Sequence, residues 1–187
     1  MIYGERIRFR AVEREDIPRY VEWFNDPEVT AGLSNYLPMS LADEARWFEN
    51  LGNRPVAERG FAIEVKTDGG WKHVGSVGFE HIEWTNRAAE FGIVIGDKAY
   101  WNEGYGTEAT RLMLKHGFET LNLNRIFLRV YETNPRAMRA YEKAGFVKEG
   151  IMRDAVYRNG CYINALLMSV LRSEWNSTQE KEKQEKP

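Results

Sequence analysis

The chain has a single cysteine, Cys161, and only three histidines among 187 residues. One thiol cannot form an internal disulfide, so packing must stabilise the fold, and the chain suits a reducing compartment. We expect Cys161 to be a small buried residue; the alternative is a nucleophile. The histidines (His73, His81 and His116) show no metal-ligand spacing with one another or with Cys161. We therefore predict no metal site.

Long apolar runs are also missing. No segment approaches the roughly 20 apolar residues of a membrane span, and the N-terminus shows no apolar stretch of signal-peptide length. Basic and acidic residues nearly balance, 26 against 28, for a net charge of −2. Nothing here indicates a nucleic-acid surface or a polybasic membrane patch. We expect a cytoplasmic protein with neither kind of partner.

The length suits one domain with one core. We place this domain at residues 1–172 and expect the polar, highly charged segment 173–187 to be a disordered tail. Alternation of apolar and polar side chains predicts strands at 6–12, 61–65 and 125–131. The turn signal Asp68-Gly69-Gly70 predicts a returning strand from 71 to about 83. The nearly continuous apolar run 89–95 predicts a central strand, and Asn159-Gly160 predicts a hairpin between the last two strands.

Helical spacing and capping residues predict four helices, beginning near Glu15, Ser40, Gly104 and Asn134. The third follows the loop Trp-Asn-Glu-Gly-Tyr-Gly-Thr at 101–107. Its glycines allow a ligand to approach the backbone, and the helix N-terminus offers unpaired N–H groups to a pyrophosphate. The loop is neither a P-loop nor a dinucleotide fingerprint. Taken alone, it is also compatible with an ordinary tight turn.

A second motif follows one strand later, where residues 134–146 read Asn-Pro-Arg-Ala-Met-Arg-Ala-Tyr-Glu-Lys-Ala-Gly-Phe. The two segments together resemble the GNAT superfamily of acetyltransferases. Its acetyl-CoA signature is Gln/Arg-x-x-Gly-x-Gly/Ala on the loop. The next helix carries an Asn, followed by an Ala or Ser and then by Tyr-Glu-Lys-x-Gly-Phe. The resemblance extends over roughly residues 6–171. Trp101 departs from it at the Gln/Arg place, and Glu103 puts a negative charge where a phosphate should approach.

Within the superfamily, the chain looks most like the branch named for ribosomal-protein N-terminal acetyltransferases (RimJ/RimL-like). It is also similar to bacterial spermidine acetyltransferases at residues 87–91 and 159–165. The resemblance implies an α/β (α+β) fold: a mixed, mostly antiparallel six- or seven-stranded sheet with helices on both faces. It further implies direct transfer of acetyl from acetyl-CoA to a primary amine in a ternary complex.

The resemblance also implies where the donor binds. The strand at 91–95 separates from the strand at 126–130 in such proteins, and the pantetheine arm fills the gap like an added strand. A backbone N–H near Val94 is expected to stabilise the oxyanion. The expected acetyl-CoA contacts are Ile93, Val94, Ile95, Asn102, Glu103, Gly104, Tyr105, Gly106, Thr107, Asn134, Ala137 and Tyr141.

Two residues are expected to transfer protons. The resemblance makes Tyr141 the general acid that protonates the departing CoA thiolate, although a core aromatic is the simpler explanation. An amine of pKa ~10 must lose a proton before it can attack, so a general base helps. Glu90, on the central strand, is the first candidate, with Glu80 and Glu83 as alternatives. An ion pair with Arg87 or another arginine would instead make Glu90 structural.

The sequence does not identify the acceptor amine. We expect its pocket between residues 25–39 and the hairpin at Asn159, where Trp23, Phe24 and Tyr36 are candidate aromatic contacts. A protein N-terminus is the leading acceptor by branch resemblance, and a polyamine, amino sugar or antibiotic is the alternative. A non-catalytic acyl-CoA-binding module and a site for another nucleotide are further alternatives. The resemblance also allows a homodimer, because relatives commonly form one.

Overall fold

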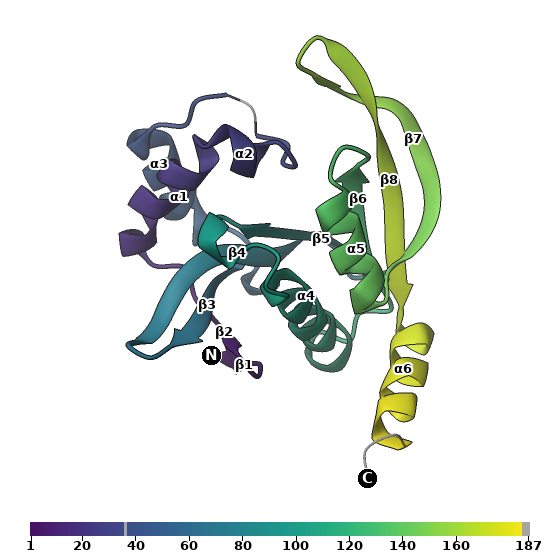
Figure 1. Cartoon of the computed structure of the whole chain (residues 1–187). Helices are drawn as coiled ribbons and strands as arrows, with labels where there is room; N and C mark the ends of the chain where they lie inside the picture. Colours follow the sequence, from purple (N-terminus) through teal and green to yellow (C-terminus); the bar gives the residue numbers. More distant parts are fainter. Residues whose placement is uncertain (36, 185–187) are drawn as a thin grey trace.

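The structure is a computed structural model, and it describes residues 1–35 and 37–184. Eight strands form one sheet in the order β1-β2-β3-β4-β5-β6-β8-β7 (Figure 1). The strands are β1 (Ile2–Tyr3), β2 (Ile7–Arg10), β3 (Phe61–Thr67), β4 (Gly70–Glu83), β5 (Ala88–Ile95), β6 (Arg125–Tyr131), β7 (Val147–Arg158) and β8 (Cys161–Leu171). Only β5 and β6 pair in parallel; the other neighbours within the described residues are antiparallel.

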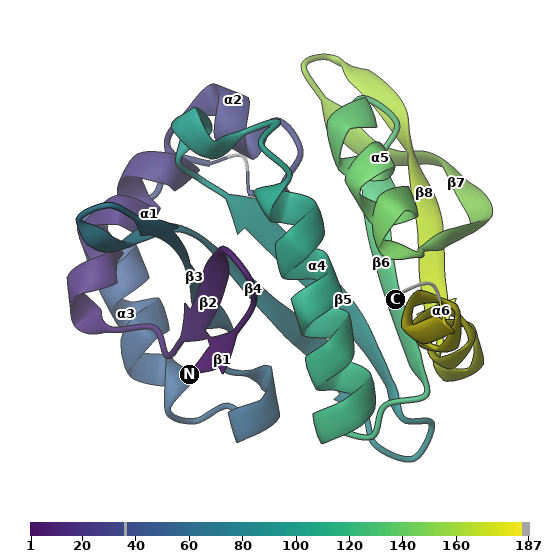
Figure 2. The same ribbon diagram turned by 60° about the horizontal axis from the view of Figure 1, so that its bottom comes forward.

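Helices cover both faces of this sheet (Figure 2). The α-helices are α1 (Ile17–Phe24), α2 (Pro27–Thr30), α3 (Leu41–Leu51), α4 (Tyr105–Lys115), α5 (Pro135–Ala144) and α6 (Arg172–Gln184). A π-helical turn, His116–Thr120, extends α4. Three short 3₁₀ turns lie at Arg14–Asp16, Val56–Glu58 and Lys98–Tyr100. The expected fold class is confirmed; the expected sheet of six or seven strands has eight.

Two apolar clusters explain the layers. Alternation along β3 places Ala62 in one cluster and Ile63 in the other. The first contains Tyr20 and Trp23 of α1, while the larger second cluster contains Met113 of α4. The sheet is thus buried on both sides, with α1 and α3 on one face and α4 and α5 on the other.

The C-terminal segment differs from the expected disordered tail. Residues 172–184 form α6, and Trp175 is buried against Phe118 at a ring-centroid distance of 5.9 Å. The Arg172 side chain donates hydrogen bonds to the backbone carbonyl oxygens of Phe118 and Leu123. These contacts pack the first turn of α6 against the rest of the domain. The charge content of the segment does not indicate such packing. Residues 185–187 lie outside the described residues.

Cys161 is exposed, contrary to expectation. It is the first residue of β8 after the Asn159-Gly160 turn, so it lies at the hairpin tip, beyond the packed part of the sheet. The turn itself is confirmed: both central residues have positive φ, 49° and 85°, as a type I′ hairpin turn requires.

Candidate active site

The strands β5 and β6 pair only from Ala88–Arg125 to Glu90–Phe127 and then separate. The rest of β5 keeps its pairing with β4 on the opposite edge. Side chains of β5, β6, α4 and α5 line a cleft of about 270 Å³ in this region. A cleft between splayed strands is what the GNAT resemblance implies for the donor. The expected contacts that line it are Ile93, Val94, Ile95, Asn102, Gly104, Gly106, Thr107, Asn134, Ala137 and Tyr141.

Backbone geometry at the start of α4 suits a phosphate. Gly104 is the N-cap with a φ of 85°, in the left-handed region that glycine tolerates. The first intrahelical hydrogen bond is donated by the Glu108 N–H to the Gly104 carbonyl at 3.0 Å. The three N–H groups of residues 105–107 precede it and have no acceptor within the helix. They are free to bind an anion at the positive end of the helix dipole.

Two expected donor contacts, Glu103 and Tyr105, are absent from the described cleft lining. Arg6 contacts both of these residues. Its Nη1 donates to the Glu103 carbonyl at 3.1 Å, and its guanidinium lies over the Tyr105 ring at 4.4 Å. The Glu103 side chain is exposed, so its charge is screened by water.

Four cationic side chains line the donor cleft, and sequence reasoning missed them as a group: Arg129, Arg136, Arg139 and Lys143. No carboxylate lines this cleft in the part of the chain that the structure describes. The last three lie at positions i, i+3 and i+7 of α5, so they share one helix face. That spacing was the signal that could have found them. The cleft therefore fits a polyanionic ligand such as CoA.

Helix α5 begins as the sequence predicts. The Asn134 Oδ1 accepts the Ala137 N–H at 3.1 Å, Pro135 opens the helix, and Gly145 ends it with a φ of 106°. The Nδ2 of Asn134 faces the loop after α2, where a Cβ on Gly32 would overlap it. Asn134 thus caps its helix and also lies at the contact between α5 and that loop.

Tyr141 lies where two clefts meet, because it lines both the donor cleft and a neighbouring one. Its ring packs edge-on against Phe91 and beside Phe146, at 6.1 and 5.8 Å between centroids. Burial raises the pKa of the Tyr141 phenol to about 12. The hydroxyl therefore stays protonated at neutral pH, as a proton donor must.

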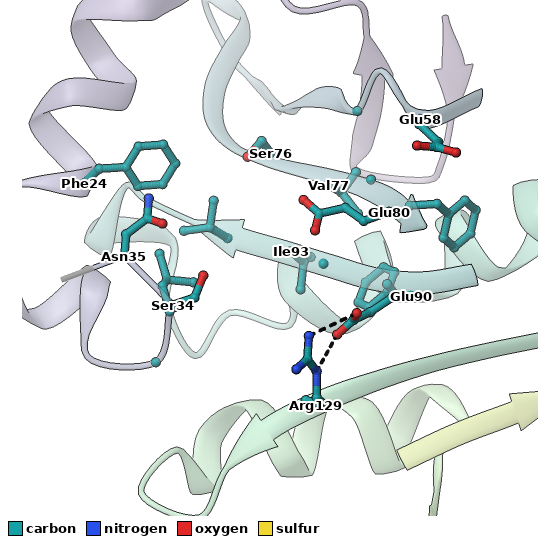
Figure 3. Close-up of a pocket in the computed structure, with 18 of the residues that line it drawn as sticks. Phe24, Ser34, Asn35, Glu58, Ser76, Val77, Glu80, Glu90, Ile93 and Arg129 are labelled. Carbon is teal, nitrogen blue, oxygen red and sulfur yellow. Dashed lines mark hydrogen bonds and ion pairs between the residues drawn. The ribbon is translucent and has the colours of Figure 1, made fainter. Parts of the chain in front are cut away.

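The neighbouring cleft has a volume of about 430 Å³ (Figure 3). Its walls are β4, β5, the loop at 32–35 and the β7–β8 hairpin. The hairpin contacts the loop through Arg158, whose Nη2 donates a hydrogen bond to the Leu33 carbonyl at 2.5 Å. This is the region in which the acceptor was expected. Phe24 lines the cleft, whereas Trp23 is buried against His73. Tyr36 lies outside the described residues.

The candidate bases differ sharply in their partners. Arg129 Nε and Nη2 donate to the two Glu90 oxygens at 2.8 and 3.1 Å (Figure 3). Glu80 lies directly opposite Glu90 across β4 and β5, and no described residue forms an ion pair with it. Two carboxylates at such positions repel each other unless one is neutralised. Glu83 does not line the cleft; it accepts a hydrogen bond from Asn86.

The described residues contain no group of three or more His, Cys, Asp and Glu side chains placed to hold a metal ion. They also include no helix that is both long and apolar enough to cross a membrane.

Comparison with known proteins decides the family. Residues 6–147 match the acetyltransferase (GNAT) domain. The chain belongs to the GNAT family. It is an acetyl-CoA-dependent N-acetyltransferase. The matched residues include the splayed strands, the α4 loop and the Asn134 helix described above.

Relatives of this GNAT enzyme include an uncharacterized N-acetyltransferase, p20, of Bacillus licheniformis, 32% identical over 93% of this chain and 97% of the relative. The spermidine N(1)-acetyltransferase of Escherichia coli K12 is 32% identical over 75% and 72%. The spermidine N-acetyltransferase of Vibrio cholerae, solved with CoA and spermine, superimposes with a TM-score of 0.83 at 27% identity, over 92% and 99%. None of these relatives is named for ribosomal proteins, so that branch stays a prediction.

Proposed function

We propose that the enzyme acetylates a small cationic primary amine that binds in the cleft beside Tyr141. Two carboxylates in that cleft form no ion pair with any described residue, and they carry the proposal. Its acidic side chains are Glu58, Glu80 and Glu90, and its basic ones are Arg54 and Arg129. Arg129 neutralises Glu90. Glu58 and Glu80 then face a single guanidinium, so a cation in this cleft gains electrostatic stabilisation.

The relatives support this acceptor class. The E. coli relative is named for spermidine, and the V. cholerae structure contains spermine. The aromatic rings of Phe24, Trp47 and Phe61 also line the cleft and can contact an ammonium group or its alkyl chain. A protein N-terminus, the acceptor favoured by the RimJ/RimL-like resemblance, carries one ammonium and lacks the second charge that Glu58 and Glu80 would bind.

The chemistry needs little covalent help from the protein. Bound acetyl-CoA supplies an acetyl thioester, which the neutral amine of the acceptor attacks. We propose that Glu80, directly or through a water, accepts the proton that the amine loses. Glu80 replaces Glu90, the first sequence candidate, because Arg129 occupies both oxygens of Glu90. Tyr141 then donates its phenolic proton to the departing sulfur.

A backbone N–H completes the proposed site. The Val94 carbonyl lies against Gly75 of β4, and the Ile95 carbonyl accepts the Trp101 Nε1–H on the donor side at 2.6 Å. Because successive residues of a strand face opposite edges, Ile93 and Ile95 direct their N–H groups to the cleft and Val94 does not. We therefore propose the N–H group of Ile93 or Ile95, rather than that of Val94, as the oxyanion donor.

The test is free-thiol release from acetyl-CoA with di- and triamines, amino sugars, aminoglycosides and N-terminal peptides. We expect the highest kcat/KM with an amine that carries a second positive charge. Charge-neutralising Glu58→Gln should raise KM for that amine and leave KM for a monoamine of equal length unchanged. Preference for peptides, or equal use of mono- and diamines, would contradict the proposal.

A further inference from the structure

The donor cleft contains a pair of side chains that the family signature does not describe. The guanidinium of Arg136 lies 3.6 Å above the centre of the Trp101 ring. Trp101 is held in turn by its Nε1–H, which donates to the Ile95 carbonyl at 2.6 Å. The stack joins the start of α5 to the loop before α4, so it spans the two walls of the cleft.

Arg136 has no carboxylate partner among the described residues, although it is half-buried. Burial lowers the pKa of its guanidinium, because the charged form loses water contacts. A stacked guanidinium keeps its N–H donors in the ring plane and free at its edges. Such a group is preorganised to bind a phosphate in a bidentate manner.

We propose that Arg136, oriented by Trp101, binds a phosphate of CoA and takes the place of the Gln or Arg that the acetyl-CoA signature has at position 101. This inference rests on the proposed donor site and is independent of the acceptor. Trp101 acts as a positioning residue: it fixes the guanidinium plane and does not itself contact the phosphate. Arg139 and Lys143 continue the same cationic face and add attraction at longer range.

The test is calorimetric titration with CoA, with dephospho-CoA, which lacks the 3′-phosphate, and with 3′,5′-ADP, in the absence of an acceptor. Arg136→Gln should weaken CoA binding about tenfold or more, as expected for a lost charged hydrogen-bond pair. Arg136→Lys should restore only part of the loss, because an ammonium cannot bind in a bidentate manner. Trp101→Leu should also weaken CoA binding, although it leaves the charge of Arg136 in place.

The ligand series assigns the phosphate. A loss for CoA and dephospho-CoA alike identifies the pyrophosphate, and a loss for CoA and 3′,5′-ADP but not dephospho-CoA identifies the 3′-phosphate. Lys115→Gln, which removes an equal charge from an exposed position on α4 outside the cleft lining, should leave every affinity unchanged.

Kinetics with S-acetyl-pantetheine, which carries no phosphate, separate this role from a structural one. Arg136→Gln should lower kcat/KM for acetyl-CoA and leave kcat/KM for acetyl-pantetheine unchanged. Unchanged CoA affinity in Arg136→Gln, or equal losses for both donors, would overturn the inference. Because binding is measured without an acceptor, neither result depends on which amine is acetylated.

Discussion

The Glu90 carboxylate and the Arg129 guanidinium form a two-bond ion pair beside the point where β5 and β6 separate. Glu90 is the last residue of β5 that pairs with β6, and Arg129 lies two residues beyond the end of that pairing. The pair therefore links the strands after their backbones have parted. Arg129 also lines both clefts, so this ion pair lies between the proposed donor and acceptor sites.

This arrangement makes the two opposed glutamates distinguishable by mutation. Glu80→Gln should lower kcat/KM by about 10²-fold near neutral pH, because a general base typically contributes that much or more. The loss should shrink as pH rises toward the pKa of the acceptor amine, since the neutral amine then needs no base. Full pH profiles of kcat/KM for the wild type, Glu80→Gln and Glu90→Gln provide the measurement.

Glu90→Gln is the matched variant, because it removes a carboxylate at the position directly across the strands. It should leave the shape of the pH profile unchanged and lower the melting temperature, since Arg129 loses its partner. If Glu90→Gln flattened the acid limb of the profile while Glu80→Gln did not, the base would be Glu90 and our assignment would be wrong.

Tyr141→Phe tests the proposed general acid. We expect kcat to fall about 10²-fold while the affinity for CoA stays within about twofold, because the ring and its packing remain. Since the pKa of the Tyr141 phenol is raised to about 12, the wild-type profile should show no alkaline loss from this group below about pH 11. Tyr131→Phe, another tyrosine on the acceptor-cleft wall, is the control. Equal losses in both variants would favour a packing role.

Much of this site could be predicted from the sequence, because local rules determine it. The N-cap at Asn134, the left-handed Gly145 and the Asn159-Gly160 turn each depend on a few neighbouring residues. The partner of Glu90 could not be predicted, because Arg129 reaches it from a strand 39 residues away. Short-range sequence patterns offer Arg87 as the nearest arginine, whereas the arrangement of the strands brings Arg129 to Glu90.

Long-range contacts also determine the structure of the C-terminal segment. The charged composition of 173–187 favours disorder, whereas the contacts of Arg172 and Trp175 with Phe118 explain why α6 forms. The basic face of α5 is different: its spacing was visible, but its function depends on the cleft that the splayed strands create.

Glu44 should make stability depend on pH. It is 4% exposed on α3, and burial raises the pKa of its carboxyl from 4.5 to about 7. Because the folded protein binds this proton more tightly than the unfolded chain, Glu44 favours folding below about pH 4.5, and this contribution is lost as pH rises through 7. Glu44→Gln should therefore raise the free energy of unfolding by about 2–3 kcal/mol at pH 8 and change it little at pH 4.

Chemical denaturation at the two pH values measures this difference. Glu49→Gln, at an exposed position on the same helix, should show no comparable pH dependence. A Glu44→Gln variant that is equally stabilised at both pH values would indicate better packing rather than relief of a buried charge.

Gly32 should affect donor binding through Asn134. A Cβ at Gly32 would overlap the Asn134 amide nitrogen, so Gly32→Ala must displace either the loop or the amide. We expect a several-fold rise in KM for acetyl-CoA, with the melting temperature nearly unchanged, because the loop is at the surface. Gly69→Ala, in a turn where a Cβ would meet nothing within 4 Å, is the control. An unchanged KM in Gly32→Ala would show that the loop yields without moving Asn134.

The most direct test of the proposed acceptor is competition in a single reaction. Wild-type enzyme, limiting acetyl-CoA, a linear triamine and an N-terminal peptide at equal concentration are mixed, and mass spectrometry counts the acetyl groups on each product. The arrangement of Glu58, Glu80 and Tyr141 predicts that the triamine takes most of the acetyl groups and that Glu58→Gln reduces its share. Predominant acetylation of the peptide would contradict a cleft built for a small cationic amine.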